Sequence, residues 1–305
     1  VIEQALAQAF PSDNNPWKSI DAIAVTQGPG LGGSLLVGLT TARTLAIIKD
    51  KPLYAVHHVM AHPFAAHIQS VADIPELQNY SVPETVVEYP FLALIVSGGH
   101  SQLVLYRSPT EYTVIGKTRD DAVGEAFDKV AKILGLPYPG GLNVSIKARE
   151  GDKEAFALPQ PKFQDAPYDL SYSGLKTAVL RAAQSAIGED YTFPSIGLPE
   201  RLSEAQKADL AASFEYVALK MLVDRTKLAH EEFKPRSVVL AGGVAASPLL
   251  RAMLEDSLPC QPIYPDMKLC TDNAAMIAAL GCLQAQAGVI PADPYSLDIK
   301  PTWPM

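Results

Sequence analysis

Two histidines separated by four positions are the clearest candidates for metal chemistry in this sequence. They lie in the segment His58-Val59-Met60-Ala61-His62. On a helix, side chains at positions i and i+4 share a face, so both imidazoles can reach one metal ion. Two unrelated surface histidines would show the same spacing. A third ligand is therefore needed to decide between the two interpretations.

Asp272 is a candidate for that third ligand. It lies in Cys270-Thr271-Asp272-Asn273, at the expected start of a helix, where an aspartate can equally serve as the N-cap. A zinc protease of the H-E-x-x-H type has a glutamate beside its first histidine as general base, and Val59 stands there instead. We therefore expect a metal site that does not belong to a peptidase of that type.

Four glycine-rich segments indicate a ligand that carries phosphate. Three of them follow expected strands, and glycine allows the backbone N–H groups to approach anionic oxygens closely. One such turn alone is ordinary, but four in one chain favour a phosphate-bearing ligand. None is followed by Gly-Lys-Ser/Thr, which excludes a Walker A loop. The segments are Gly28–Gly33, Ser97–His100, Pro139–Gly141 and Gly242–Val244.

An acidic segment from Asp120 to Lys132 permits two interpretations. Glu125, Asp128 and Lys132 fall on neighbouring helical turns, which is typical of a solvated face with i,i+3 and i,i+4 ion pairs. In a nucleotide cleft, an aspartate at this place could instead accept hydrogen bonds from ribose hydroxyls. The sequence pattern leaves both interpretations open.

Expected strands and helices alternate along the chain, which predicts an α/β fold with largely parallel sheets. We expect Asp120 or Asp121 to cap one of the helices, and the Ser203–Gln206 capping box to open the longest one. The strands are expected at 22–26, 53–56, 91–96, 102–106 and 237–241, and the helices at 34–48, 120–134, 203–233 and 274–287, with a further helix that begins at Pro248 after the N-cap Ser247.

The apolar hairpin at 91–106 resembles the start of a second lobe similar to the first. We expect residues 1–90 to form the remainder of an N-terminal lobe, with a loop insertion at 69–90, and residues 91–305 to form the second lobe. The first lobe lacks an opening hairpin, and the chain begins with Val1 inside a helical pattern. We therefore expect its N-terminal strands to be absent from this sequence.

The composition limits the class of protein. The chain has 305 residues and a net charge of −8, which argues against a nucleic-acid binder that needs no helper or local basic patch. Its three cysteines form no C-x-x-C pair, so a reducing, cytoplasmic compartment fits best. No apolar run reaches the ~20 residues that span a membrane.

These segments together resemble the tRNA N6-adenosine threonylcarbamoyltransferases of the TsaD type, formerly called O-sialoglycoprotein endopeptidases. The resemblance runs along the whole chain. The matching stretches are Thr26–Leu31, Leu35–Gly38, Val56–His62, Val96–His100, Asp120–Lys132, Tyr138–Gly141, Ser171–Thr177, Ala241–Val244, Cys270–Asn273 and Pro301–Pro304.

The resemblance implies a two-lobed ASKHA fold, the architecture shared by actin and sugar kinases. It also implies the reaction. A threonylcarbamoyl group passes from threonylcarbamoyl-adenylate to N6 of the adenosine beside the anticodon (position 37) of ANN-decoding tRNAs, and AMP is released.

The resemblance further implies ligands and partners. His58, His62 and Asp272 would hold one divalent metal ion, iron(II) in the first instance and zinc as the alternative. No catalytic residue is assigned beyond that site. A paralogous TsaB-like subunit and a small TsaE-like ATPase would assist with tRNA. The residues expected to contact the adenylate are Ile95, Val96, Ser97, Gly98, Gly99, Asp128, Gly141 and Ser247, with Asp128 on the ribose.

Two substitutions depart from the pattern of the family. Ser247 stands where the family usually has an asparagine that contacts the adenylate, and Met60 replaces the usual glutamate between the histidines. Two other functions therefore stay open: a sugar-kinase-like phosphotransferase that uses ATP, and a catalytically impaired paralogue that binds a partner.

Overall fold

The computed structural model describes residues 1–70, 80–81, 87–161 and 163–305. They form two compact units, each described here by itself. The first comprises Val1–Phe64 and Asn273–Met305, and the second comprises Ala65–Asp272. Most of the loop expected at 69–90 lies outside the described residues.

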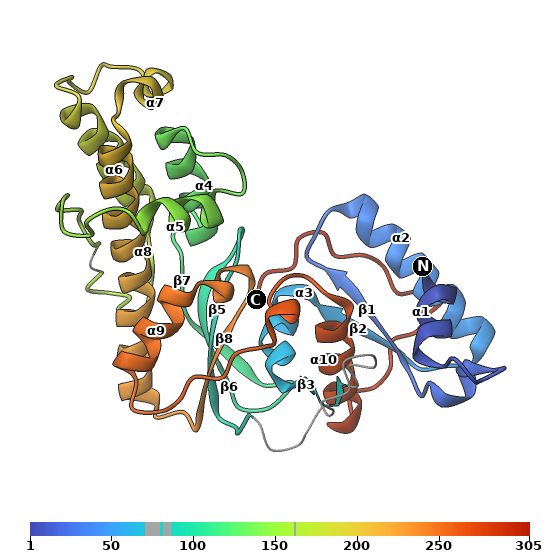
Figure 1. Ribbon diagram of the computed structural model, residues 1–305. Helices are drawn as coiled ribbons and strands as arrows, with labels where there is room; N and C mark the ends of the chain where they lie inside the picture. Colours follow the sequence, from blue (N-terminus) through green and yellow to red (C-terminus); the bar gives the residue numbers. More distant parts are fainter. Residues whose placement is uncertain (71–79, 82–86, 162) are drawn as a thin grey trace. The chain divides into compact units, whose positions relative to one another are not determined.

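The first unit is built on two parallel strands, β1 (Ile23–Gly28) and β2 (Leu53–His57) (Figure 1). Helix α2 (Gly32–Lys49) connects them and ends at Asp50, whose backbone is left-handed. Successive strand side chains point to opposite faces. Ile23 and Val25 accordingly pack toward α2, while Ala24 faces α10 (Ala274–Gln286).

Close packing of α10 on the strands depends on one glycine. A Cβ added at Gly281 would lie 2.6 Å from the Cβ of Ala24. Helix α10 contacts both β1 and β2, and residues 273–305 group with the N-terminal unit, although the division drawn from the sequence places them in the second lobe. The unit also contains α1 (Ile2–Ala9) and the 3-10 helix η1 (Pro16–Ser19).

Strand β2 leads directly into the histidine segment. Helix α3 (His58–Ala61) follows the strand without a loop, and the 3-10 helix η2 (His62–His67) continues it. Val56 and Val59 are buried on either side of the junction, which fixes the direction in which the chain leaves the sheet.

The second unit contains a four-stranded sheet in the order β7-β6-β5-β8. Its strands are β5 (Phe91–Val96), β6 (Ser101–Tyr106), β7 (Tyr112–Lys117) and β8 (Ser237–Ala241). Only β5 and β8 are parallel. The expectation of largely parallel sheets is therefore wrong here, because short hairpin turns join β5 to β6 and β6 to β7 and force antiparallel pairing.

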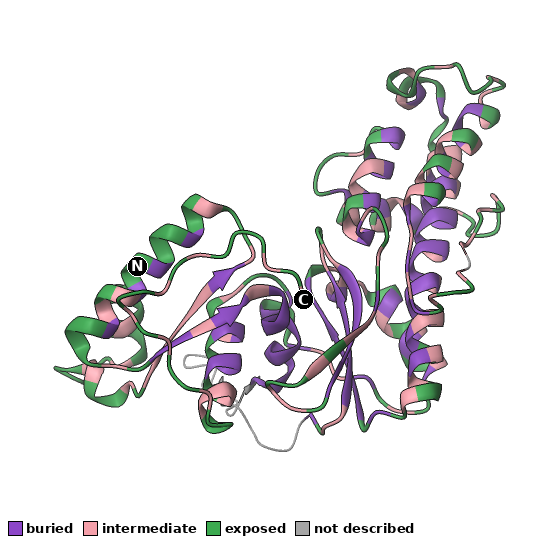
Figure 2. Ribbon diagram, turned by 180° about the vertical axis from the view of Figure 1, so that it is seen from behind, coloured by how far each residue is buried: buried purple, intermediate pink, exposed green. Residues whose placement is uncertain are grey.

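Helix α8 (Glu204–Phe233) is the longest element of this unit and packs against β5 (Figure 1). The predicted capping box is confirmed: the Ser203 hydroxyl accepts from the Gln206 N–H at 3.2 Å, and Gln206 Oε1 accepts from the Ser203 N–H at 2.9 Å. Buried residues run along β5, β6, β8 and the inner side of α8, which form the core of the unit (Figure 2).

Shorter helices surround α8, and α4, α5, α6 and α9 all contact it. The unit also holds a small antiparallel pair of strands. The remaining helices of the unit are α4 (Val123–Leu134), α5 (Gly140–Ala148), α6 (Ser173–Ala186), η3 (Ser195–Gly197), α7 (Leu198–Arg201), η4 (Gly243–Ala246), α9 (Pro248–Ser257) and η5 (Met267–Leu269), and the pair is β3 (Gln69–Ser70) with β4 (Tyr80–Ser81).

The expected cap of α4 is wrong. Its N-cap is Ala122, whose side chain makes no cap hydrogen bond, and the N–H of Val123 donates to the Ser101 hydroxyl at 2.8 Å. Asp120 instead accepts hydrogen bonds from the N–H groups of Tyr172 at 2.8 Å and Ser173 at 3.1 Å, at the start of α6. Asp120 therefore accepts from N–H groups at the start of a helix some fifty positions later, groups that have no acceptor within that helix. Local sequence cannot indicate such a contact.

Candidate metal centre and phosphate-binding turns

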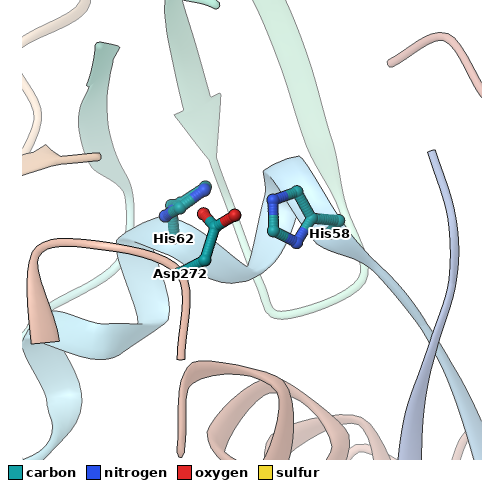
Figure 3. Close-up of side chains that lie close together, drawn as sticks. All are labelled: His58, His62 and Asp272. Carbon is teal, nitrogen blue, oxygen red and sulfur yellow. The ribbon is translucent and has the colours of Figure 1, made fainter. Parts of the chain in front are cut away.

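His58, His62 and Asp272 lie together (Figure 3). Each offers one ligand atom, and these atoms all lie within 4.8 Å of one another. The two imidazole centroids are 5.0 Å apart with their planes at 76°, and the carboxylate of Asp272 lies between them. His62 is buried, His58 is half-buried and Asp272 is exposed, so the site opens to solvent on the carboxylate side.

The local fold explains how residues so far apart in sequence meet. His58 begins α3 and His62 directly follows its last residue, so one helical turn separates them. Asp272 directly precedes Asn273, the N-cap of α10, and α10 packs against α3.

The capping interpretation of Asp272 is wrong. The cap of α10 belongs to Asn273, whose side-chain oxygen accepts from the Met276 N–H at 2.9 Å. The carboxylate one residue earlier points instead at the two histidines. Asn and Asp both cap helices well, so the sequence alone does not distinguish their roles.

The donor set suits a divalent transition metal. Two imidazole nitrogens and one carboxylate oxygen are the ligands of non-haem iron(II) sites, and zinc accepts the same donors. Three protein ligands leave coordination positions for a substrate oxygen. The three side chains could therefore hold a metal ion, and the arrangement suits chemistry better than a purely structural site.

The second unit gathers glycine turns at the carboxyl ends of its two parallel strands. After β5, the Ser97 N–H donates to the His100 carbonyl at 2.8 Å, which closes a turn with Gly98 and Gly99 exposed. After β8, Gly242 has φ +93°, and a Cβ there would lie 2.3 Å from the Val96 oxygen. The two turns are thus adjacent, at the strand ends where α/β sheets bind ligands.

Helix α4 begins against the first of these turns. A Cβ at Gly124, the second residue of the helix, would lie 2.8 Å from both the Ser97 oxygen and the Gly98 Cα. The N-terminus of a helix presents N–H groups and a partial positive charge, which favour anions. Sequence reasoning missed Gly124, because a single glycine inside an acidic helix gives no signal of a close approach.

Asp128 lies beside another glycine segment. Its Oδ1 accepts from the Gly140 N–H at 2.8 Å, and a Cβ at Gly140 would lie 2.5 Å from the Asp128 Cα. The start of α5, which includes Gly141, is thereby held against α4. The carboxylate still offers a second oxygen at this position.

The rest of the acidic segment forms ion pairs. Lys129 Nζ lies 2.7 Å from Glu125 Oε1 and 2.7 Å from Asp121 Oδ1, and Lys176 Nζ lies 2.8 Å from Asp121 Oδ2. Partial burial alone would raise the pKa of Asp121, but the hydrogen bonds from the two lysines outweigh it and lower that pKa. The ion-pair interpretation therefore holds for Glu125, while the ribose interpretation of Asp128 stays a prediction.

A cavity of about 840 Å³ lies among α5, α8 and α9, and Ser247 lines it. The Ser247 hydroxyl accepts from the Leu250 N–H at 3.3 Å, so it caps α9 as the sequence predicts.

Glu215 also lines the cavity and accepts a hydrogen bond from the Ser145 hydroxyl. Burial raises the pKa of Glu215. Neither Glu215 nor Ser145 carries a motif that would have singled it out.

Two of the residues expected to contact a nucleotide are wholly buried. Ile95 and Val96 have 0 % exposed surface, because they are core residues of β5. The ligand contact expected of the segment 95–99 stays a prediction, and its exposed residues are Gly98 and Gly99 in the turn that follows the strand. In the part of the chain that the structure describes, no helix has both the length and the apolar character needed to cross a membrane.

Comparisons of the sequence with known proteins agree on one family. The family described as TsaD, tRNA N6-adenosine threonylcarbamoyltransferase, matches residues 1–279. Proteins named tRNA N6-adenosine threonylcarbamoyltransferase from Geobacillus kaustophilus and Trichodesmium erythraeum are each 43 % identical, over 94 % and 93 % of this chain. The matches cover 76 % and 82 % of those relatives. A relative of the same name from Symbiobacterium thermophilum is 46 % identical over 95 % of this chain. That match covers 76 % of the relative's length.

Comparison of the structure finds more distant proteins. The crystal structure of full-length HypF in its phosphate- and nucleotide-bound form is 12 % identical, with a TM-score of 0.56 over 83 % of this chain. The structure of T. kodakarensis HypF is 13 % identical, with a TM-score of 0.57 over 88 %. This chain spans 38 % and 41 % of those proteins, and the likeness concerns the fold alone. The sequence matches decide the family: the chain belongs to TsaD, the tRNA N6-adenosine threonylcarbamoyltransferases.

Proposed function

We propose that this chain is an acyltransferase that moves a threonylcarbamoyl group from threonylcarbamoyl-adenylate to N6 of adenosine 37 in ANN-decoding tRNAs. The observation that carries the proposal is the cluster of His58, His62 and Asp272 in a chain of this family. A peptidase reaction has no support, because the position beside His58 is Val59 and offers no general base.

The adenylate would occupy the second unit. We assign its phosphate to the turn Ser97–Gly99 and the start of α4, where backbone N–H groups can receive anionic oxygens. The ribose hydroxyls would donate to Asp128 near Gly141. The adenine would lie toward the cavity lined by Ser247, whose hydroxyl is shorter than an asparagine side chain and is engaged in capping α9.

His58, His62 and Asp272 would hold the metal, which we propose to be iron(II), with zinc as the alternative. Once bound, such an ion supplies Lewis-acid polarisation of a carbonyl oxygen. Because one helical turn separates His58 from His62, both imidazoles would bind the ion from the same face of α3. A group that approaches the ion would therefore be oriented by these ligands.

The reaction balances without a further cofactor. The N6 amine forms a bond to the carbamoyl carbon, the bond from that carbon to the phosphate oxygen breaks, and the amine loses a proton as AMP leaves. Hydrogen bonds from the glycine turn stabilise the charge on the departing phosphate. The amine is a weak nucleophile, because its lone pair is delocalised into the ring, so positioning supplies much of the rate.

We also propose a two-lobed ASKHA architecture in which the two compact units are the lobes. The parallel strands with helices in the first unit and the glycine turns at the strand ends of the second support it. The charge of −8 supports assisted tRNA binding, with a TsaB-like subunit and a TsaE-like ATPase as helpers in the cytoplasm.

A transfer assay tests the function. Threonylcarbamoyl-adenylate and tRNA are mixed with the chain and the helper proteins, and AMP release and modified adenosine are both measured. Modified tRNA with equal release of AMP supports the proposal. ATP turnover with phosphate transfer to a small hydroxyl acceptor in the absence of tRNA would identify a kinase instead. Metal binding without any transfer would identify a partner-binding paralogue.

A further inference from the structure

The C-terminal segment, residues 298–305, lies along the end of β1. The Lys300 N–H donates to the Gln27 carbonyl at 2.8 Å, and the Gly30 N–H donates to the Pro301 carbonyl at 3.1 Å. Both bonds join main-chain atoms, so the segment is held as an added strand would be.

The sequence of β1 accommodates this backbone contact. A Cβ added at Gly28 would lie 1.8 Å from the Lys300 oxygen, so only glycine fits there without displacing the segment. The side-chain amide of Gln27, which is buried, donates to the Asp298 carbonyl at 2.8 Å. Three residues of the segment, Asp298, Lys300 and Pro301, therefore form hydrogen bonds with residues at the end of β1 and just after it.

The segment also contacts His57, the residue directly before α3. Nε2 of His57 lies 2.9 Å from the Trp303 carbonyl oxygen, and the two rings are 4.8 Å apart. Lys300 Nζ lies 4.3 Å from the centre of the Trp303 ring and covers it. His57 is only 3 % exposed, so its imidazole is packed inside this contact.

His57 is also the N-cap of α3. Its Nδ1 accepts from the Met60 N–H at 3.3 Å. Because Nδ1 is the acceptor, the ring hydrogen is on Nε2 and is donated to the Trp303 carbonyl. A single neutral imidazole thus connects the C-terminal segment to the first turn of the helix that begins with His58.

We propose that His57 and Trp303 are positioning residues of the metal site, which set the orientation of α3 and thereby of both histidine ligands. The inference rests on the proposed function, since it presupposes metal at His58 and His62. Metal ligands bind well only when surrounding groups hold them in one geometry. A four-residue helix cannot supply that rigidity by itself, and the cap and the carbonyl contact supply it here.

Two variants separate this role from general stability. In His57→Asn, the shorter side chain can still cap α3, because asparagine is a good N-cap, but it cannot reach the Trp303 carbonyl. In Trp303→Ala, the carbonyl stays and the ring that packs on His57 is lost. Trp17→Ala is the matched control. Trp17 also carries a lysine over its ring, with Lys49 Nζ 5.4 Å from the ring centre, and it lies on η1.

The measurement is Co²⁺ binding to the full-length chain after metal removal, in competition with a chromogenic chelator. The visible spectrum of bound Co²⁺ reports the ligand geometry directly, and thermal unfolding of the metal-free proteins reports the fold. We expect His57→Asn and Trp303→Ala each to weaken Co²⁺ binding by about tenfold and to change the spectrum. Trp17→Ala should match the wild type in both.

The results distinguish this proposal from the proposed function. Wild-type affinity and spectrum in both variants would overturn the positioning role while leaving the metal site intact. A wild-type chain that binds no Co²⁺ would overturn the metal site and the positioning role together. If His57→Asn proves unfolded, Trp303→Ala decides the matter, because it leaves the cap and every main-chain contact in place.

Discussion

Replacing Gly124 with alanine tests whether α4 and the Ser97–Gly99 turn form one phosphate site. The new Cβ would lie 2.8 Å from two backbone atoms, the Ser97 oxygen and the Gly98 Cα, whereas ordinary contact begins at 3.4 Å. Neither atom belongs to a flexible side chain, so the start of the helix or the turn must retreat by about 0.6 Å.

A shift of that size reaches the limit of hydrogen bonding. An N–H to phosphate bond near 2.9 Å would lengthen to roughly 3.5 Å, where little attraction is left. Hydrogen bonds to a charged group contribute about 1.5–3 kcal/mol each, so losing one weakens binding by about 10- to 100-fold. We therefore expect Gly124→Ala to bind AMP that much more weakly than the wild type in isothermal titration.

Gly174 provides the control for this change. It is also the second residue of a helix, α6, and a Cβ there would meet nothing within 4 Å. Gly174→Ala should keep wild-type AMP affinity and unfold at the same temperature or slightly higher, because alanine favours helix by up to about 1 kcal/mol. Equal AMP affinity in Gly124→Ala and the wild type would refute the phosphate assignment.

Three further changes follow from the same structure. Burial raises the pKa of Glu215, so its folded form holds the proton more tightly than the unfolded chain. Stability from this group is complete below its unfolded pKa and is lost as the pH rises through the folded pKa. Glu215→Gln should therefore flatten the fall of melting temperature across that range, and an unchanged pH profile would contradict this. Gly281→Ala should lower the free energy of unfolding by about 1–3 kcal/mol in urea titrations, because its Cβ would lie 2.6 Å from the Ala24 Cβ. Gly33→Ala, with open space around it, should show no such loss, and equal stability of the two would count against the packing argument. Asn273→Ala removes the cap of α10, which costs about 1 kcal/mol, and should weaken metal binding through the neighbouring carboxylate. Unaltered Co²⁺ affinity would show that the cap does not position that carboxylate.

The parts of the site that follow from local chemistry were predictable from the sequence. The spacing of His58 and His62 requires only one helical turn, and the cap at Ser247 requires only the proline after it. Asp272 was one candidate because of its place at the start of a helix, but its spacing from the histidines carries no local signal, and only the resemblance to a family singled it out. The structure resolved its two interpretations by giving the cap of α10 to Asn273.

Contacts between distant segments were not predictable. Asp120 serves the start of α6 rather than α4, and Gly124 meets the turn after β5, because tertiary packing decides both. The glycine turn predicted the antiparallel hairpin of β5 and β6, but β7 was not expected as a strand, so the antiparallel share of the sheet was underestimated. The contact of Trp303 with His57 spans 246 positions and has no counterpart in any local pattern.

The central claim is that one metal ion is bound jointly by two imidazoles and one carboxylate. Crystals grown with Co²⁺ or Fe²⁺ and measured at the absorption edge of the metal locate the ion directly by anomalous scattering. The account predicts one peak per chain, about 2.0–2.2 Å from a ring nitrogen of His58, a ring nitrogen of His62 and a carboxylate oxygen of Asp272. A peak elsewhere, or one at the histidines with Asp272 out of reach, would contradict it.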